Sequence, residues 1–363
     1  MNKRWVKSAG VLLFTLACVM LTAILPVKAA TANSEAEIRQ IMEQAFANGD
    51  LEVTITVDRT FSVSEYQAKQ EADAYAAELI KILEESALKN GKLMNGTSYS
   101  TVIANNRTAT YKFDISSQFM KKVTALSSEK SAYTRALKAL KTRDYTTNFY
   151  AENAMYFDTF VLALQHHPEY NYGIMVWKSA DGTFGYRPSG ELSTSAIKTR
   201  MAKANTKADA ILKKIIEKGM TNKQKLKAIH DYLVKNCVYK DGISAGRYND
   251  AFTAYGCLIK KEAVCQGYAA AFNLLALKSG IRSIAVTGDA GGASHAWNYV
   301  KNGSGYYYID ATWDDPMPDG GSKAKVCQDY FYLMQKKLEK KNTHTWDKTE
   351  NAKKYVDYAS VLQ

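Results

Sequence analysis

The sequence predicts an α+β protein in which a cysteine-bearing helix packs on an antiparallel sheet, preceded by a smaller mixed α+β region. Residues 265–280 are rich in helix formers and end at a glycine. Residues 295–301 and 304–310 resemble two strands, and the Asn302-Gly303 pair between them is typical of a tight hairpin turn. In the front half, helix-like and strand-like segments follow one another without a regular βαβ order, which favours α+β over a parallel α/β fold.

The first thirty residues have the layout of a secretory signal peptide. A basic start is followed by an apolar run from Val11 to Leu25 and by small residues ending at Ala29 and Ala30, near which cleavage is expected. The run is short for a membrane span, so cleavage is favoured over an uncleaved anchor. Cys18 lies inside this run and belongs to the discarded segment. We therefore expect a secreted or cell-surface protein.

The composition is that of a globular protein, with 46% hydrophobic and 23% charged residues and five prolines. This excludes a disordered chain. Loss of residues 1–30 removes four basic residues and lowers the formal charge from +12 to +8. A basic exported protein can meet anionic cell-wall polymers or membrane surfaces, although lysines scattered along helical faces are more typical of solvated surface. No nucleic-acid motif is present, and a monomer is expected.

The pattern divides the chain into a signal peptide (1–30), an N-terminal α+β domain (31–195) and a C-terminal domain (196–363) that contains the cysteine helix and the hairpin. The segment 189–195, rich in serine and glycine, is the best linker. Thr221 and Gln224 form a capping box at the start of one helix, and Ser34 with Glu37 forms another. The elements expected before the cysteine helix are helices over 34–48, 63–89, 118–165 and 193–236, a strand over 51–57, and hairpins over 97–115 and 170–188.

Cys265 lies at the N-terminus of its helix. Helix N-termini carry partial positive charge and free N–H groups, which favour a thiolate and can bind an oxyanion. Gly267, two residues on, allows a substrate or another backbone to approach closely. An inert buried thiol is the ordinary fate of a single cysteine, so the helix alone does not decide the role of Cys265.

The hairpin supplies a histidine and an aspartate on one face. If Asn302 and Gly303 form the loop, His295 lies directly opposite Asp310; if residues 302–305 form the loop, the two are diagonal neighbours. In either register Asp310 can accept a hydrogen bond from His295, as the orienting carboxylate of a catalytic triad does. A cysteine, a histidine and an aspartate in this arrangement predict an acyl-transfer site.

Three segments together resemble the core motifs of the transglutaminase-like superfamily, in its bacterial exported and cytokinesis-protein-like branch. They are Val264–Ala269, His295–Asn298 and Tyr308–Pro316. The resemblance is clear over residues 225–346. It implies a papain-like α+β core and a catalytic triad of Cys265, His295 and Asp310.

Four further residues are candidates for the oxyanion hole or the substrate groove. Tyr255, ten residues before the cysteine, and Gln266, directly after it, are candidates for the oxyanion hole, with packing and helix capping as the alternatives. Trp297 and Trp313 flank the histidine and the aspartate, where they either pack beneath the hairpin or line the groove.

No metal site or cofactor is expected. His166 and His167 lack further ligands at metal spacing, and no calcium loop is present. Whether Cys237, Cys257 or Cys327 forms a disulfide stays open, since export permits one and a chain of this length does not need one.

The function predicted from these residues is that of an exported cysteine enzyme acting on peptide or protein amides through a thioester. Hydrolysis by a peptidase or amidase is favoured, because water is the default acceptor. A protein-crosslinking transglutaminase uses the same triad and is the first alternative. A non-catalytic binding module for cell-wall or surface proteins is the second.

Overall fold

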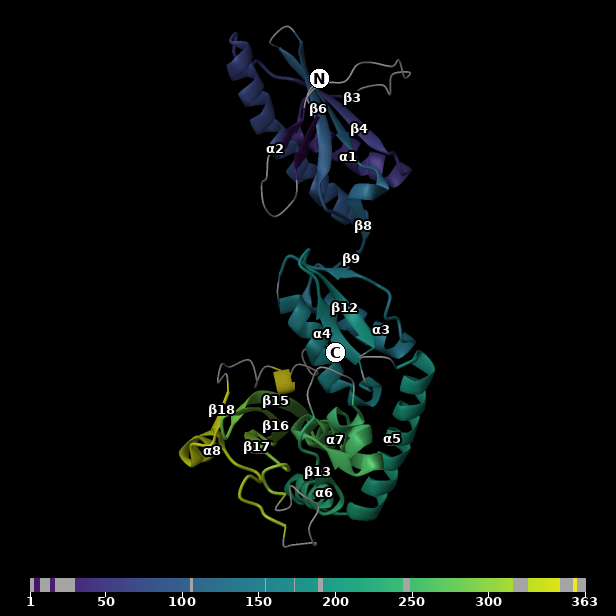
Figure 1. Cartoon of the computed structure of the whole chain (residues 1–363), viewed down its shortest axis with the longest axis vertical. Coiled ribbons are helices and arrows are strands. Elements are labelled where there is room, and N and C mark those ends of the chain that lie inside the picture. Colours follow the sequence, from purple (N-terminus) through teal and green to yellow (C-terminus); the bar gives the residue numbers. More distant parts are fainter. Residues whose placement is uncertain are drawn as a thin grey trace. The chain divides into compact units, whose positions relative to one another are not determined.

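The computed structural model describes residues 30–104, 107–153, 155–172, 174–188, 192–243, 249–315, 326–346 and 355–357, together with the backbone of 3–6 and 14–16. The chain forms two compact units, which Figure 1 shows in the colours of the sequence. The first contains residues 1–126, 147–152 and 179–184. The second contains 127–146, 153–178 and 185–363.

The first unit is built on a sheet of order β2-β1-β6-β7-β4-β3. Its strands are β1 (Lys3–Val6), β2 (Phe14–Leu16), β3 (Ala30–Ala32), β4 (Glu52–Asp58), β6 (Thr97–Ala104) and β7 (Thr108–Asp114). All neighbours are antiparallel except β3 and β4. The predicted strand over 51–57 and the hairpin over 97–115 are confirmed. Most of the predicted signal peptide lies outside the described residues, so its removal stays a prediction.

Two helices, α1 (Glu35–Asn48) and α2 (Glu65–Lys89), supply the apolar partner of this sheet. Alternate residues of β4 and β7 are buried, as expected for a sheet with one covered face. Ser34 caps α1 as predicted. However, the Glu37 carboxylate accepts a hydrogen bond from the backbone of Asn33 and not from Ser34, so the predicted capping box is only half formed.

Short elements complete the first unit: β5 (Lys92–Met94) pairs with β8 (Met120–Lys122), and β9 (Thr124–Ala125) pairs in parallel with β10 (Phe149–Tyr150). A 3-10 turn, η1 (Ser117–Phe119), precedes β8. The expectation that helices dominate 118–165 is therefore wrong for residues 118–128 and around residue 150. Strands of two or three residues are too short to show a period of two in the sequence.

The second unit contains most of the helices. They are α3 (Glu129–Thr142), α4 (Met155–His166), η2 (Pro168–Tyr170), α5 (Thr194–Ile215), α6 (Asn222–Asn236), η3 (Asp250–Phe252), η4 (Gly256–Lys260), α7 (Cys265–Lys278) and α8 (Gln335–Lys341). The predicted capping box of Thr221 and Gln224 opens α6. Two further predicted strands appear as β11 (Ile174–Lys178) and β12 (Thr183–Pro188).

The division of the chain differs from the boundary expected at residue 195, because α3 and α4 belong to the second unit. Gln165 on α4 explains why. Its side chain accepts a hydrogen bond from the backbone of Ala285 at 2.7 Å, and its own carbonyl accepts one from Asn273 of α7 at 2.6 Å. These long-range contacts leave no trace in local sequence patterns.

A four-stranded antiparallel sheet of order β17-β16-β15-β18 forms the centre of the second unit. Its strands are β15 (Ser283–Ala290), β16 (Ala293–Asn302), β17 (Gly305–Ile309) and β18 (His344–Thr345). Helix α7 packs against β15 and β16, and the buried amide of Asn298 on β16 donates to the Ala269 carbonyl on α7 at 3.0 Å. Beside them, β13 (Val238–Tyr239) pairs in parallel with β14 (Glu262–Ala263). The expected helix-on-sheet core is present.

Gly288 on β15 is needed for a close approach between strands. A Cβ there would lie 2.1 Å from the backbone oxygen of Thr345, which means that only glycine lets β18 come alongside. This contact brings His344 to the edge of the central sheet.

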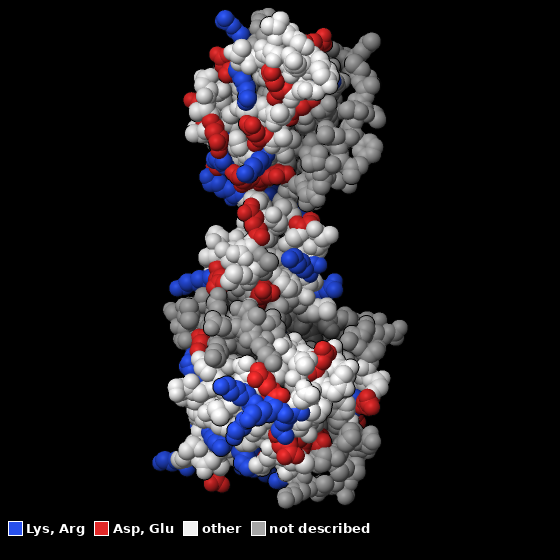
Figure 2. Space-filling view, turned by 90° about the vertical axis from the view of Figure 1, so that its left-hand side faces the viewer, with Lys and Arg blue, Asp and Glu red and all other residues white. Residues whose placement is uncertain are grey.

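Charges of both signs are mixed over the face of the molecule drawn in Figure 2, with a group of Lys and Arg side chains on the second unit. Helix α8 alone contains Lys336, Lys337, Lys340 and Lys341. Among the described residues, none of the helices combines the length and the apolar character that a membrane crossing requires.

A substitution at Gly267 tests whether α7 packs directly against the backbone of Ala251. A Cβ at this position would lie 2.2 Å from the Ala251 carbonyl oxygen, so Gly267→Ala must push the helix away from this backbone. We expect the variant to lose about 2 kcal/mol of unfolding free energy, as for other overpacked cores. Chemical denaturation measures this loss.

The matched control is Gln266→Ala, since Gln266 is exposed on the same helical turn. It should change stability by less than about 0.5 kcal/mol. Equal stability of the Gly267→Ala and Gln266→Ala proteins would show that the helix does not rest on this backbone.

Candidate active site

Cys265 is the first residue of α7 and is only partly buried. Val264, the N-cap residue, has an extended backbone and makes no side-chain cap, so no capping side chain occupies the N–H of Gln266 in the first turn of the helix. The backbone N–H groups of Gln266 and Ala296 and the side chain of His295 lie close enough to the Cys265 sulfur to lower its pKa. The one tertiary contact that the sequence argument had to assume, between Cys265 and His295, is therefore present.

His295 lies on β16 and is hydrogen-bonded to Asp310, with 2.7 Å between Nε2 and Oδ2. The strand register pairs Lys301 with Tyr306 and Asn302 with Gly305, so the turn consists of Gly303 and Ser304. Of the two registers considered, this is the one that makes His295 and Asp310 diagonal neighbours. The direct pairing, with Asn302 and Gly303 as the turn, is wrong.

Electrostatics favours a thiolate and an imidazolium in this cluster. Burial raises the pKa of Cys265, but the hydrogen bond with His295, its charge and the two backbone N–H groups outweigh burial and lower the pKa overall. Burial lowers the pKa of His295, but hydrogen bonds and charges of Asp310 and Cys265 raise it to about 9. The two directions agree, since each charged form stabilises the other.

Asp310 is buried and ionised. Burial raises its pKa, yet hydrogen bonds from His295 and His344 and the charge of His295 lower it to about 2. Its other oxygen, Oδ1, accepts from the backbone N–H groups of Thr312 at 2.9 Å and Trp313 at 3.2 Å. The turn that follows β17 thus donates two backbone hydrogen bonds to the Asp310 carboxylate, and these bonds fix the orientation of the Asp310 side chain.

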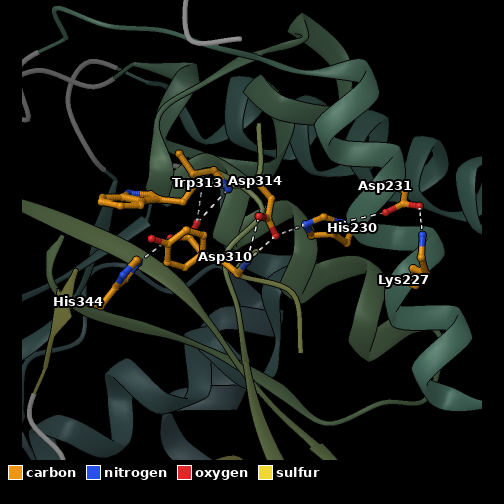
Figure 3. A network of polar contacts seen from close by, with 9 residues as sticks. Lys227, His230, Asp231, Asp310, Trp313, Asp314 and His344 are labelled. Carbon is orange, nitrogen blue, oxygen red and sulfur yellow. Dashed lines mark hydrogen bonds and ion pairs between the residues drawn. The ribbon is translucent and has the colours of Figure 1, made fainter. Parts of the chain in front are cut away.

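A second carboxylate in the same turn, Asp314, is held by His230 of α6. Figure 3 shows this line of polar contacts, which continues from His230 to Asp231 and Lys227. His230 and Asp314 are both fully buried, with 3.0 Å between Nε2 and Oδ2, and Asp314 also accepts from the backbone of Tyr330. Since the Asp314 N–H donates to the Asp310 carbonyl, the pair anchors the turn that carries Asp310.

With this geometry in view, the chain can be compared with known proteins. Residues 209–311 match the family model described as the transglutaminase-like superfamily. This part of the chain is similar to the transglutaminase-like superfamily. The matched segment includes Cys265, His295 and Asp310, and the predicted resemblance is confirmed.

Three solved structures are also similar to this chain. The first is a transglutaminase ("TGase") structure, with 12% identity over 82% of this chain and 62% of the other and a TM-score of 0.29. The second is a candidate cysteine protease from Cytophaga hutchinsonii, with 15% identity, 38% and 61% coverage and a TM-score of 0.27. The third is a candidate protease from Parabacteroides distasonis, with 11% identity, 72% and 40% coverage and a TM-score of 0.25. The chain spans less than two thirds of each of them, and no curated protein matched it.

Aromatic rings surround His295. Trp297 is buried and stacks on His295 with 5.7 Å between ring centres, so it packs beneath the imidazole and does not line a groove. Trp313 is only partly buried and meets His295 edge-on at 6.2 Å. Of the two tryptophans, Trp313 is the one with a surface available to a substrate.

The two oxyanion candidates differ in position. Gln266 is exposed, and its backbone N–H, not its side chain, reaches the cysteine. Tyr255 is buried, and the Arg200 guanidinium lies 5.5 Å from the centre of its ring. Packing therefore accounts for Tyr255 in this structure. Gly267, in turn, faces the backbone of Ala251 and not a substrate.

Among the described residues, one group of side chains brings metal-type donors close together: His295, Asp310 and His344, within 4.8 Å. Hydrogen bonds to Asp310 account for both imidazoles, so the cluster is explained without an ion. The four described cysteines, including Cys237 and Cys257, are present without disulfides.

His230, His344 and Asp314 are not among the candidate site residues that the sequence predicts. The structure gives them a closer relation to the site, because each histidine binds an aspartate of one turn. The only sequence signal was the presence of Asp310 and Asp314 four residues apart together with more histidines than the triad uses.

The His230–Asp314 pair predicts pH-dependent stability. Burial lowers the pKa of His230, but hydrogen bonds and charges of Asp231 and Asp314 outweigh it and raise the pKa above 6.5. A raised folded-state pKa means that protonation stabilises the folded protein below pH 6.5, and that this contribution is lost as pH rises through the folded-state pKa. We expect His230→Gln to cost about 3 kcal/mol at pH 6, because Asp314 loses its buried cation.

The measurement is denaturant unfolding of both proteins from pH 6 to pH 9.5. The stability difference between wild type and His230→Gln should shrink as pH increases. Lys227→Gln, which alters only the exposed end of the same line of contacts, serves as control and should have a small effect. A difference that is independent of pH would rule out a charged His230.

Proposed function

We propose that the transglutaminase-like domain is a cysteine enzyme that transfers acyl groups from peptide or protein amides. Cys265 is the nucleophile, His295 the base and Asp310 its orienter. The observation that carries this proposal is that His295 contacts Cys265 and Asp310 at once, with Nε2 committed to the carboxylate. This leaves the other ring nitrogen for the sulfur, as a triad requires.

In the first step the Cys265 thiolate attacks the amide carbonyl carbon, and the carbonyl oxygen becomes an oxyanion. The backbone N–H groups of Gln266, at the start of α7, and of Ala296, on β16, lie beside the sulfur and supply the stabilisation of this charge. The His295 imidazolium then gives its proton to the leaving amine. The C–N bond breaks, and a thioester between Cys265 and the acyl group remains.

In the second step an acceptor attacks the thioester while neutral His295 takes its proton, and the acyl group leaves the sulfur. With water as acceptor the product is a carboxylic acid, and with a lysine amine it is a new amide. We favour water, because no additional acceptor site is needed. A protein-crosslinking transglutaminase is the alternative, and its chemistry differs only in the acceptor.

The proposed enzyme acts outside the cytoplasm, as a secreted or cell-surface protein without residues 1–30. Support comes from the basic, apolar and small-residue regions at the N-terminus. The N-terminal sequence of protein recovered from the cell surface or medium tests this, and it should begin near Ala30 or Thr31. Recovery of the full chain from the cytoplasm alone would contradict export.

Cys265 should react with iodoacetamide at pH 6 about tenfold faster than an ordinary free thiol, because its pKa is lowered. Cys265→Ala should remove both this labelling and all amide-cleaving activity, and leave the unfolding transition unchanged. Mass spectrometry of the labelled protein identifies the site, with Cys257→Ala as a control that keeps both properties. Products formed with and without an added primary amine distinguish hydrolysis from transamidation.

Labelling of Cys265 no faster than that of a free thiol would indicate a non-catalytic binding module. Full activity in the Cys265→Ala protein would contradict the proposal that Cys265 is the nucleophile.

A further inference from the structure

Asp310 is shared by two imidazoles at a single oxygen atom. Oδ2 accepts from His295 Nε2 at 2.7 Å and from His344 Nε2 at 2.9 Å, while Oδ1 accepts from two backbone N–H groups. A carboxylate offers about four acceptor positions, so all of them are occupied. A triad needs only one of these imidazoles, and the second requires its own explanation.

Both imidazoles must present a hydrogen to Asp310. The carboxyl group has a pKa of about 2 and is ionised at any physiological pH, so it has no proton to donate. Each Nε2 that faces Oδ2 therefore carries the proton of that hydrogen bond. For His295 this fixes which nitrogen faces the cysteine. For His344 it requires that Nε2 stays protonated throughout a catalytic cycle.

His344 is held in that state by a chain of hydroxyl groups. The Tyr330 hydroxyl donates to Thr343 Oγ1 at 3.2 Å, and Thr343 Oγ1 lies 2.9 Å from His344 Nδ1. Because the Thr343 hydroxyl can donate to Nδ1, the remaining ring proton belongs on Nε2. The ring is also buried and in contact with Trp297 and Trp313, at 5.0 and 4.8 Å between centres, so it is locked in orientation.

Few other ionisable groups face this cluster. Cys265 of α7 contacts His295, and Tyr239 of β13 lies close enough to be influenced by Cys265 and Asp310. Asp314 belongs to the same turn but is paired with His230. Lys341 of α8 lies over the outer face of Tyr330, 4.5 Å from its ring centre. His344 is thus the group that shares the Asp310 charge with His295.

We propose that His344 is a positioning residue that keeps Asp310 ionised and aimed at His295 in both protonation states of the catalytic imidazole. This role rests on the proposed function of the triad. When His295 gives up its proton, the carboxylate keeps a strong donor and does not need to rearrange. When His295 is charged, His344 takes part of the carboxylate charge, and His295 holds its proton less tightly than it would against Asp310 alone.

The test is the titration of His295 in ¹⁵N-histidine-labelled protein, followed by NMR. The chain has five histidines, so a His295→Gln protein assigns the signal. In His344→Leu, Asp310 keeps only one imidazole, and the His295 midpoint should rise by about one pH unit, a tenfold gain in proton affinity. In His344→Gln, where an amide N–H can replace Nε2, the midpoint should stay near the wild-type value.

Thr343→Val is a second variant that keeps the histidine and removes only the hydroxyl that sets its tautomer. It should shift the His295 midpoint in the same direction as His344→Leu, by a smaller amount, and it remains informative if His344→Leu does not fold. A purely structural role for His344 predicts lower stability with an unchanged midpoint in all three variants. That result, or a His344→Gln protein that behaves like His344→Leu, would overturn the proposal.

The titration does not depend on turnover, so it separates this proposal from the proposed function. Slow labelling of Cys265 together with the expected shifts of the His295 midpoint would contradict the proposed enzyme function and support the proposed role of His344. Fast labelling of Cys265 with unchanged His295 midpoints would support the proposed enzyme function and contradict the proposed role of His344.

Discussion

A negative charge buried at Asp310 is the constraint around which the second unit is organised. A carboxylate removed from water needs a donor for each of its acceptor positions, and no single element of this chain supplies them all. The donors come from β16, from β18 and from the turn that begins at the aspartate itself. Three features supply these hydrogen-bond donors to Asp310: the register of β16 and β17, Gly288, which lets β18 come alongside β15, and the turn that follows β17.

The second anchor of that turn shows how electrostatics and packing are combined. His230 reaches from α6 to Asp314, and the Tyr268 hydroxyl reaches from α7 to Asp315 at 2.6 Å. The two helices are thereby tied to one short segment, and Cys265 on α7 is fixed relative to Asp310 on the other side of His295. Rigid placement of this kind is what a site needs when its reacting atoms must meet within a few tenths of an ångström.

Local sequence was sufficient for the parts of the site that have a local cause. The N-terminus of α7, the hairpin and the capping box of α6 follow from helix formers, turn residues and capping residues within a few positions. The hairpin register was narrowed to two choices, because turn geometry in a glycine-rich sequence allows the loop to slip. Both choices kept His295 and Asp310 on one face, which is why the pair could be predicted although the turn could not.

Other features depend on contacts between distant segments and could not be read locally. His344 joins the cluster because β18 returns to the edge of the sheet, and Gln165 ties α4 to β15 and α7. The two- and three-residue strands between residues 117 and 150 also show no pattern in the sequence from which they could be predicted.

The position of β18 also has a consequence for the order in which the protein is made. Cys265 and the helix that activates it are synthesised first, His295 and Asp310 follow, and the strand that steadies the carboxylate comes 79 residues after the cysteine. A growing chain therefore contains Cys265 before the residues that position His295 and Asp310 have all been synthesised. Only a chain that has reached its last strand can assemble the whole charge network, so maturation of the site is coupled to completion of the fold.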